Sequence, residues 1–265
     1  MWQVNRRYLL KTKTIAEMND PVATLKYSAA PDTTSLRTDL SAAFRWAARC
    51  GMHEGICNHL SVMIHGDQKY FLMNPRGRHW ARMTPEALIV IDEEGNTIQG
   101  EGLPLKTGFT IHTGIHLTHP NATCVFHTHM PYATALTAIR GGELRQVHQN
   151  STRFLGQCAY DRSFNGLAFD TDEGRRMAQV MGDKSILFLG HHGVVVVGDT
   201  IATTLDDLYY LEKACEIQVL AMSTGEELAE IPPEIAEVTA KQFANRSASA
   251  DLFLAEIKRV LNEGV

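Results

Sequence analysis

A chain of 265 residues with 44% hydrophobic and 21% charged side chains is long enough to bury one large core, so we expect one globular domain. The 25 basic and 30 acidic residues give a net charge of -5 without a concentrated basic stripe, which argues against a nucleic-acid partner. No apolar run approaches the ~18 residues of a membrane span, so we expect no membrane partner. Five cysteines without a CxxC pair favour a reduced, cytoplasmic compartment.

The first part of the chain predicts a helix followed by strands. Residues 1–34 lack sustained periodicity and are interpreted as an N-terminal arm, with the main domain at 35–226 and a C-terminal helical extension of that domain at 227–265. Apolar residues at helical spacing predict a helix over about 36–50. Apolar runs bounded by turn residues then predict strands at 57–64, 69–73 and 88–92.

The second part alternates helices and strands. We expect helices over about 109–119, 132–139 and 171–181, and strands at 122–129, 185–189 and 194–197. The last two strands flank the turn Gly190 to Gly193, whose glycines let the backbone bend sharply. Two long amphipathic helices, over about 201–223 and 233–262, complete the chain.

Two histidines end the strand at 122–129. Because side chains alternate faces along a strand, His127 and His129 point the same way with Cα atoms about 7 Å apart, close enough to bind one ion. His192, in the glycine-flanked turn, adds a third imidazole, and His191 competes with it as a ligand. An open shell of neutral imidazoles suits a divalent Lewis-acid ion with room for a substrate, so we predict one such ion per subunit.

Other polar residues are less distinctive. His112 and His116 stand four residues apart on one helix face, but no acid accompanies them as in HExxH, which favours packing of this helix against the sheet. Arg76, Lys106 and Thr107 are predicted in glycine-containing loops, where they would either hold a carboxylate or phosphate or remain solvated. Neither a GxSxG motif nor a dinucleotide fingerprint is present.

Four segments together carry a resemblance to the class II aldolase/adducin family, and the helix at 205–219 resembles the adducin head in particular. The segments are Phe71 to Gly77, Val125 to His129, His191 to Val194 and Asp206 to Leu220. The resemblance spans about Leu36 to Thr224. It implies a three-layer α/β/α fold with a central, mainly antiparallel sheet, and, as in many members, a homotetramer with a divalent metal near a subunit interface.

The resemblance also implies site residues. His127, His129 and His192 match the metal ligands, and His192 is preferred over His191 because the family's turn reads Asn-His-Gly. Three loops match those that bind the anionic end of the substrate in the sugar-phosphate aldolases. They contribute Asn58 and Ser61, Arg76 and Gly77, and Lys106 and Thr107.

One position departs from the family pattern. Gly108 stands where those aldolases carry the glutamate that acts as catalytic acid and base. Carbon–carbon lyase chemistry needs a metal to polarise a carbonyl and a group that moves the proton. Glu101, His148, His191 or a tyrosine from a neighbouring subunit are the candidates to replace that glutamate.

Three functions therefore remain open. The leading hypothesis is a metal-dependent lyase, for aldol cleavage or decarboxylation, acting on a small oxygenated anionic substrate with zinc as the preferred ion and iron or manganese as alternatives. A non-haem iron oxygenase is the second, because loss of the glutamate leaves coordination positions open. The third is a non-catalytic binding or scaffold protein similar to the adducin head.

Overall fold

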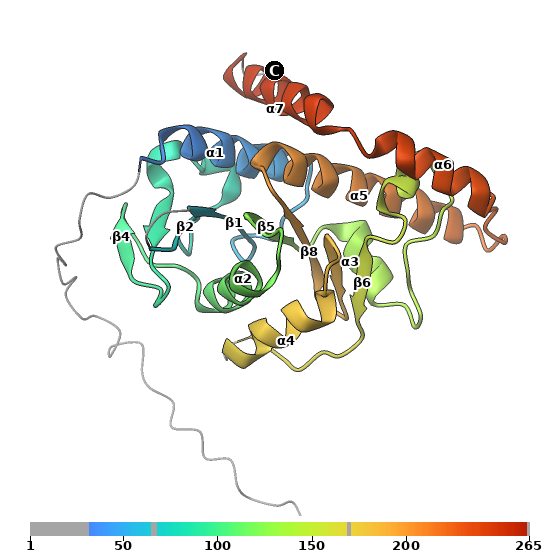
Figure 1. Cartoon of the computed structure of the whole chain (residues 1–265), viewed down its shortest axis with the longest axis horizontal. Coiled ribbons are helices and arrows are strands. Elements are labelled where there is room, and N and C mark those ends of the chain that lie inside the picture. Colours follow the sequence, from blue (N-terminus) through green and yellow to red (C-terminus); the bar gives the residue numbers. More distant parts are fainter. Residues whose placement is uncertain (1–31, 65–67, 169–170, 264–265) are drawn as a thin grey trace, which may run out of the picture.

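The computed structural model describes residues 32–64, 68–168 and 171–263, and within these ranges an eight-stranded sheet lies between two layers of helices (Figure 1). The predicted arm lies outside the described residues except for its last three. Among the helices of these ranges, none combines the length and apolarity needed to cross a bilayer.

The elements follow one another as strands and helices in an irregular alternation. The strands are β1 His59–Ile64, β2 Tyr70–Met73, β3 Ile89–Ile91, β4 Thr97–Gln99, β5 Cys124–Thr128, β6 Cys158–Asp161, β7 Ile186–Leu189 and β8 Gly193–Gly198. The α-helices are α1 Thr34–Arg49, α2 Lys106–Thr118, α3 Pro131–Thr137, α4 Thr171–Met181, α5 Ile201–Met222, α6 Pro233–Phe243 and α7 Ser247–Glu263. Short 3-10 helices are η2 Trp80–Arg82, η3 Pro85–Ala87 and η4 Gln149–Phe154.

The sheet has the order β4-β3-β2-β1-β5-β8-β7-β6. Every neighbouring pair is antiparallel except β6 and β7, which run parallel. The mainly antiparallel sheet between helical layers confirms the fold class expected from the resemblance. Strands β1, β5 and β8 lie at its centre, and the candidate ligands lie on or next to two of them.

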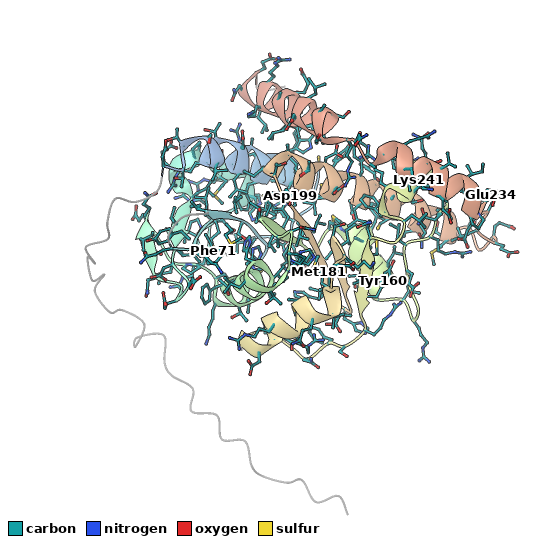
Figure 2. The ribbon with its side chains drawn as sticks, viewed as in Figure 1. Phe71, Tyr160, Met181, Asp199, Glu234 and Lys241 are labelled. Atoms are coloured by element: carbon teal, nitrogen blue, oxygen red, sulfur yellow. The ribbon has the colours of Figure 1, made fainter. Side chains whose placement is uncertain are left out.

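Alternation along the central strands explains the two helical layers. Phe126 of β5 points into a core shared with α1, α3 and α5, whereas its neighbour Val125 points into a second core shared with α2 and α4. In Figure 1, α1 and α5 lie above the sheet and α2 and α4 below it. Figure 2 shows the side chains that fill these layers, with Phe71 of the sheet inside and Lys241 on the outer helix α6.

Helices α2 and α4 touch through two glycines. A Cβ at Gly114 would lie 2.5 Å from the backbone carbon of Gly174, and a Cβ at Gly174 would lie 2.2 Å from the carbonyl oxygen of Thr110. Because any larger side chain would push these helices apart, both glycines set how closely the lower layer packs on the sheet.

Three details differ from the sequence expectations. The helix expected over 233–262 is two helices, because α6 packs on η4 whereas α7 turns to pack on α1 and α5. Strands β4 and β6 were not predicted, since both are short and only partly apolar. Helix α2 begins at Lys106, so Lys106 and Thr107 lie in its first turn rather than in the preceding loop.

Candidate metal centre

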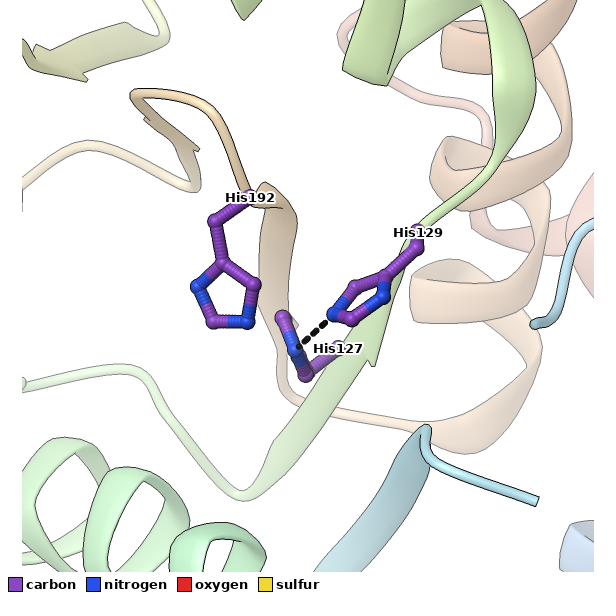
Figure 3. Close-up of side chains that lie close together, drawn as sticks. All are labelled: His127, His129 and His192. Carbon is purple, nitrogen blue, oxygen red and sulfur yellow. Dashed lines mark hydrogen bonds between the residues drawn. The ribbon is translucent and has the colours of Figure 1, made fainter. Parts of the chain in front are cut away.

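The three histidines predicted as metal ligands lie together at one end of the central strands. Because β5 and β8 are antiparallel, the end of β5 with His127 and His129 meets the β7–β8 turn that carries His192 (Figure 3). One nitrogen from each ring lies within 4.8 Å of the other two. The ring centroid of His192 is 4.8 Å from that of His127 and 4.7 Å from that of His129.

Hydrogen bonds determine which nitrogens of His127 and His129 face this centre. The Nδ1 of His127 donates to the carbonyl oxygen of Val194 at 2.9 Å, and the Nδ1 of His129 donates to Oε2 of Glu54 at 2.6 Å. Both acceptors are oxygens without a proton, so each neutral ring has its bare lone pair on Nε2. These two Nε2 atoms face one another at 3.2 Å (Figure 3).

Two facing lone pairs at this distance repel one another unless a cation lies beside them. Burial disfavours a proton on His127 and on His192, because it holds the pKa of His127 well below its usual range and lowers the pKa of His192 to about 4. Neutral imidazoles are the form in which histidine binds metals. The donor set therefore fits a divalent ion.

Glu54 was not predicted as a site residue. It lies in the loop before β1, its side chain is 70% exposed, and its bond to His129 reproduces the carboxylate–histidine pairs that orient metal ligands. Nothing in the local sequence marks it, because the two residues are 75 positions apart. Only the tertiary fold brings them together.

Asn58, predicted to bind substrate, is buried beside the centre. Its side-chain oxygen accepts the backbone N–H groups of Glu54 at 2.7 Å and of His129 at 3.3 Å. Its backbone carbonyl accepts hydrogen bonds from the side chains of Asn74 and Trp80, both at 3.2 Å. Asn58 thus ties the Glu54 loop, the end of β5 and the segment after β2 to one another.

The other residues predicted for substrate binding fall into two groups. Arg76 and Gly77 are exposed in the turn after β2, and the Arg76 N–H donates to the Leu103 carbonyl at 2.9 Å, which joins this turn to the loop before Lys106 and Thr107. Ser61 instead lies fully buried within the fold. Its hydroxyl is bonded to His112 and His116 of α2, the two histidines expected to pack this helix on the sheet.

Gly108 lies against a fourth imidazole. A Cβ at this position would be 2.6 Å from Cδ2 of His59, whose ring stacks on His127 with centroids 5.1 Å apart. Burial lowers the pKa of His59 to about 3. His59 was missed from the sequence, although the β1–β5 pairing, which places it directly opposite His127, would have revealed it.

Glu101, His148 and His191, three of the candidates to replace a glutamate at position 108, do not join the cluster of three histidines. Glu101 is exposed in the loop before α2, and His148 precedes η4, which packs on α5 and α6. His191 is exposed in the β7–β8 turn with a φ of 57°. It lines a separate cavity of about 580 Å³ together with Arg140 and Arg162.

Comparisons with known proteins agree with this geometry. The family model described as Class II Aldolase and Adducin N-terminal domain matches residues 38–219. A Caulobacter vibrioides protein whose name places it in aldolase class 2 is 34% identical over 218 residues, covering 82% of this chain and 84% of that protein. Decarboxylase NovR of Streptomyces niveus is 31% identical over 208 residues, covering 77% and 76%.

Among solved structures, an aldolase II superfamily protein from Pseudomonas syringae superposes with a TM-score of 0.82 at 30% identity, covering 89% of this chain and 95% of that one. The residues that the family model matches include all eight strands and the three histidines. The chain therefore belongs to the class II aldolase and adducin family.

Proposed function

We propose that this protein is a metal-dependent lyase that cleaves a carbon–carbon bond in a small oxygenated anionic substrate. One observation carries the proposal: the bare Nε2 atoms of His127 and His129 lie 3.2 Å apart beside His192. The Nδ1 atoms of both rings are hydrogen-bonded elsewhere, to the Val194 carbonyl and to Glu54. A site of this kind is open to ligands, because three imidazoles leave a tetrahedral ion one position short.

His127, His129 and His192 would hold the ion, and zinc is the first choice because neutral imidazoles suit it, with iron and manganese as alternatives. When bound, such an ion polarises a carbonyl group and stabilises negative charge that develops on its oxygen. Glu54 and the Val194 carbonyl keep two of the rings in the binding tautomer.

We assign the anionic end of the substrate to the turn that carries Arg76 and Gly77 and to the first turn of α2, with Lys106 and Thr107. Support comes from the Arg76–Leu103 backbone bond, which joins the Arg76 turn to the loop before α2, and from Asn58, which ties the loop before β1 to the end of β5. Aldol cleavage and decarboxylation both fit this arrangement. The name of the Caulobacter relative refers to an aldolase, and the name of the Streptomyces relative refers to a decarboxylase.

Metal content of the purified protein tests the ligand assignment. We expect close to one equivalent of a divalent ion in the wild type and a large loss in His127→Ala. His79→Asn, which changes an exposed histidine outside the cluster, is the control and should keep its metal. Metal content unchanged by His127→Ala would contradict the proposal.

Two rival functions predict other outcomes for the same preparations. Oxygen uptake that requires Fe(II) and all three histidines would identify a non-haem iron oxygenase instead of a lyase. A wild-type protein that binds no divalent ion would favour a binding or scaffold role like that of the adducin head.

We further propose a cytoplasmic homotetramer. All five cysteines are free thiols in the structure, in keeping with a reducing compartment. Apolar side chains are exposed along α5 and α6, at Leu220 and Val238 among others, where contacts between subunits would cover them. Sedimentation equilibrium measures the assembly, and a monomer at micromolar concentration would contradict it.

A further inference from the structure

A row of buried hydrogen bonds leads from the metal centre into the layer between the sheet and α2. It starts at His59 of β1, passes to His112 of α2, returns to Ser61 of β1, and continues to His116 and the Ala122 carbonyl. The four side chains are at most 3% exposed. Buried polar groups of this kind are costly unless each is satisfied, so the direction of every proton in the row is constrained.

The direction follows from the far end. The Ala122 carbonyl only accepts, so the Nδ1 of His116 at 2.6 Å carries a proton, and its Nε2 is bare in the neutral ring. That Nε2 accepts the single proton of the Ser61 hydroxyl at 2.7 Å, a much shorter contact than the one from this hydroxyl to the Val125 carbonyl at 3.5 Å. The Ser61 oxygen must then accept from the Nδ1 of His112.

The same logic reaches the metal centre. With its proton on Nδ1, His112 presents a bare Nε2, which accepts from the Nδ1 of His59 at 3.2 Å. The remaining nitrogen of His59, Nε2, is left with a lone pair. Among the residues that the structure describes, the hydrogen bond of the His59 ring is made by Nδ1 alone, and the His59 side chain is only 2% exposed.

The backbone of Gly108 packs closely on the His59 ring. A Cβ there would begin 2.9 Å from Nε2 of His59 and 2.6 Å from Cδ2, so an alanine would already press on the ring. The ring also stacks on the metal-ligand histidine His127. His59 therefore lies between the buried row of hydrogen bonds and the metal-ligand histidine His127.

We propose that the row His116–Ser61–His112 holds His59 in one tautomer, so that Nε2 of His59 is the hydrogen-bond acceptor for a hydroxyl group of the ligand bound at the metal centre. The proposal rests on the proposed function for the presence of that metal. It assigns the protein to substrates with a hydroxyl next to the group that the metal binds. It also gives Ser61 a positioning role, through His112, instead of direct contact with the substrate.

The tautomer is tested in the metal-free protein. Long-range ¹H–¹⁵N correlation spectra of the histidine-labelled wild type should show Nδ1 of His59 and His112 protonated and both Nε2 atoms bare. Ser61→Ala should allow the second tautomer to appear for His112 while the fold, followed by circular dichroism, persists. A wild-type His59 with its proton on Nε2 would overturn the row, whatever the protein catalyses.

Ligand binding tests the acceptor. The Co(II)-loaded protein is titrated with glycolate, which has a hydroxyl donor, and with methoxyacetate, which has none, while the visible absorption of Co(II) reports binding. The two probes differ in chelating strength by themselves, so the wild type and each variant are compared by their glycolate preference. This preference is the ratio of the affinity for glycolate to the affinity for methoxyacetate. We expect His59→Phe to reduce that preference by about tenfold, the size of one neutral hydrogen bond.

Two further variants separate the two nitrogens of the ring. His59→Asn keeps a donor near Nδ1, toward His112, but has no atom at Nε2, so it should lose the preference as His59→Phe does. His59→Gln places an amide near Nε2 and should retain part of the preference. Equal preference in the wild type, His59→Phe and His59→Asn would overturn the proposal, whereas a wild type that fails to bind Co(II) would overturn the proposed function itself.

Discussion

At the level of single residues, Glu54 shows how an exposed side chain can determine the behaviour of a buried centre. Its carboxylate holds the Nδ1 proton of His129, and Asn58 holds the Glu54 backbone, so the orientation of one metal ligand depends on a loop outside the sheet. Carboxylates in this position raise the basicity of the ligand and hold its ring in place.

Replacing Glu54 should therefore weaken metal binding without removing a ligand. We expect Glu54→Gln to reduce Zn²⁺ affinity by roughly 10–100-fold, measured by competition with a chromophoric chelator. The matched control Glu226→Gln changes an exposed glutamate in the loop after α5 and should leave the affinity unchanged. Equal affinities in the two variants would show that the His129–Glu54 bond has no influence on the ion.

Gly108 allows a second residue-level prediction. The added methyl group of Gly108→Ala would meet the buried ring of His59, and overpacking of this kind costs about 1–3 kcal/mol of the free energy of unfolding. Urea denaturation measures the loss. In the double variant Gly108→Ala/His59→Ala the clash is gone, so the loss of stability caused by the alanine at position 108 should largely disappear. If the losses of the two single variants simply add in the double variant, the contact between the alanine and His59 is contradicted.

At the level of elements, the C-terminal helices are attached to the rest of the fold by buried charges on α5. Arg246, in the linker between α6 and α7, binds the carboxylate of Asp207 with Nη2 at 2.7 Å from Oδ1, and Asp207 is only 5% exposed. The neighbouring Asp206 binds Arg153 of η4 at 2.7 Å, and the guanidinium of Arg153 lies over the ring of Tyr210. The linker is thus held at the point where the chain changes direction.

Removal of Arg246 should lower the free energy of unfolding, because it leaves the buried carboxylate of Asp207 without its partner. Arg246→Ala leaves Asp207 without this partner, and we expect a loss of about 2–3 kcal/mol, below the range for fully buried pairs because Arg246 is partly exposed. Arg259→Ala, which breaks an exposed pair with Glu256 on α7, should cost less than about 1 kcal/mol. Urea denaturation of both variants compares them, and equal losses would contradict a special role for the linker.

For the whole molecule, the buried histidines make stability depend on pH. The pKa of His59 is lowered to about 3 and that of His192 to about 4, from 6.5, chiefly by burial. Between 6.5 and these values the unfolded chain binds more protons than the folded protein. The free energy of unfolding therefore falls as the pH falls through this window, and is fully retained above it.

Urea denaturation of the metal-free protein in the presence of a chelator should show this loss. We expect the free energy of unfolding to fall by roughly 1–2 kcal/mol per buried histidine between pH 7 and pH 5. His59→Phe, which removes one of these groups, should show a smaller fall over the same range. A stability independent of pH in the wild type would contradict the burial of neutral imidazoles.

Much of the fold and of the metal centre could be predicted because the signals are local. Alternation along a strand places His127 and His129 on one face, glycines around His191 and His192 require a turn, and apolar periodicity marks the long helices. The break between α6 and α7 has no such signal. It accompanies contacts with distant segments: α6 packs on η4, α7 packs on α1 and α5, and Arg246 binds Asp207, 39 residues earlier in the chain.

By itself, the sequence determined the family, the mainly antiparallel sheet between helices and the three histidines that gather at one end of it. Only the tertiary structure decided how the rings are held and what faces them. Glu54, His59 and the Val194 carbonyl approach the centre from separate strands and loops. Hydrogen-bond direction and burial depend on distances between such segments, and neither composition nor spacing along the chain contains that information.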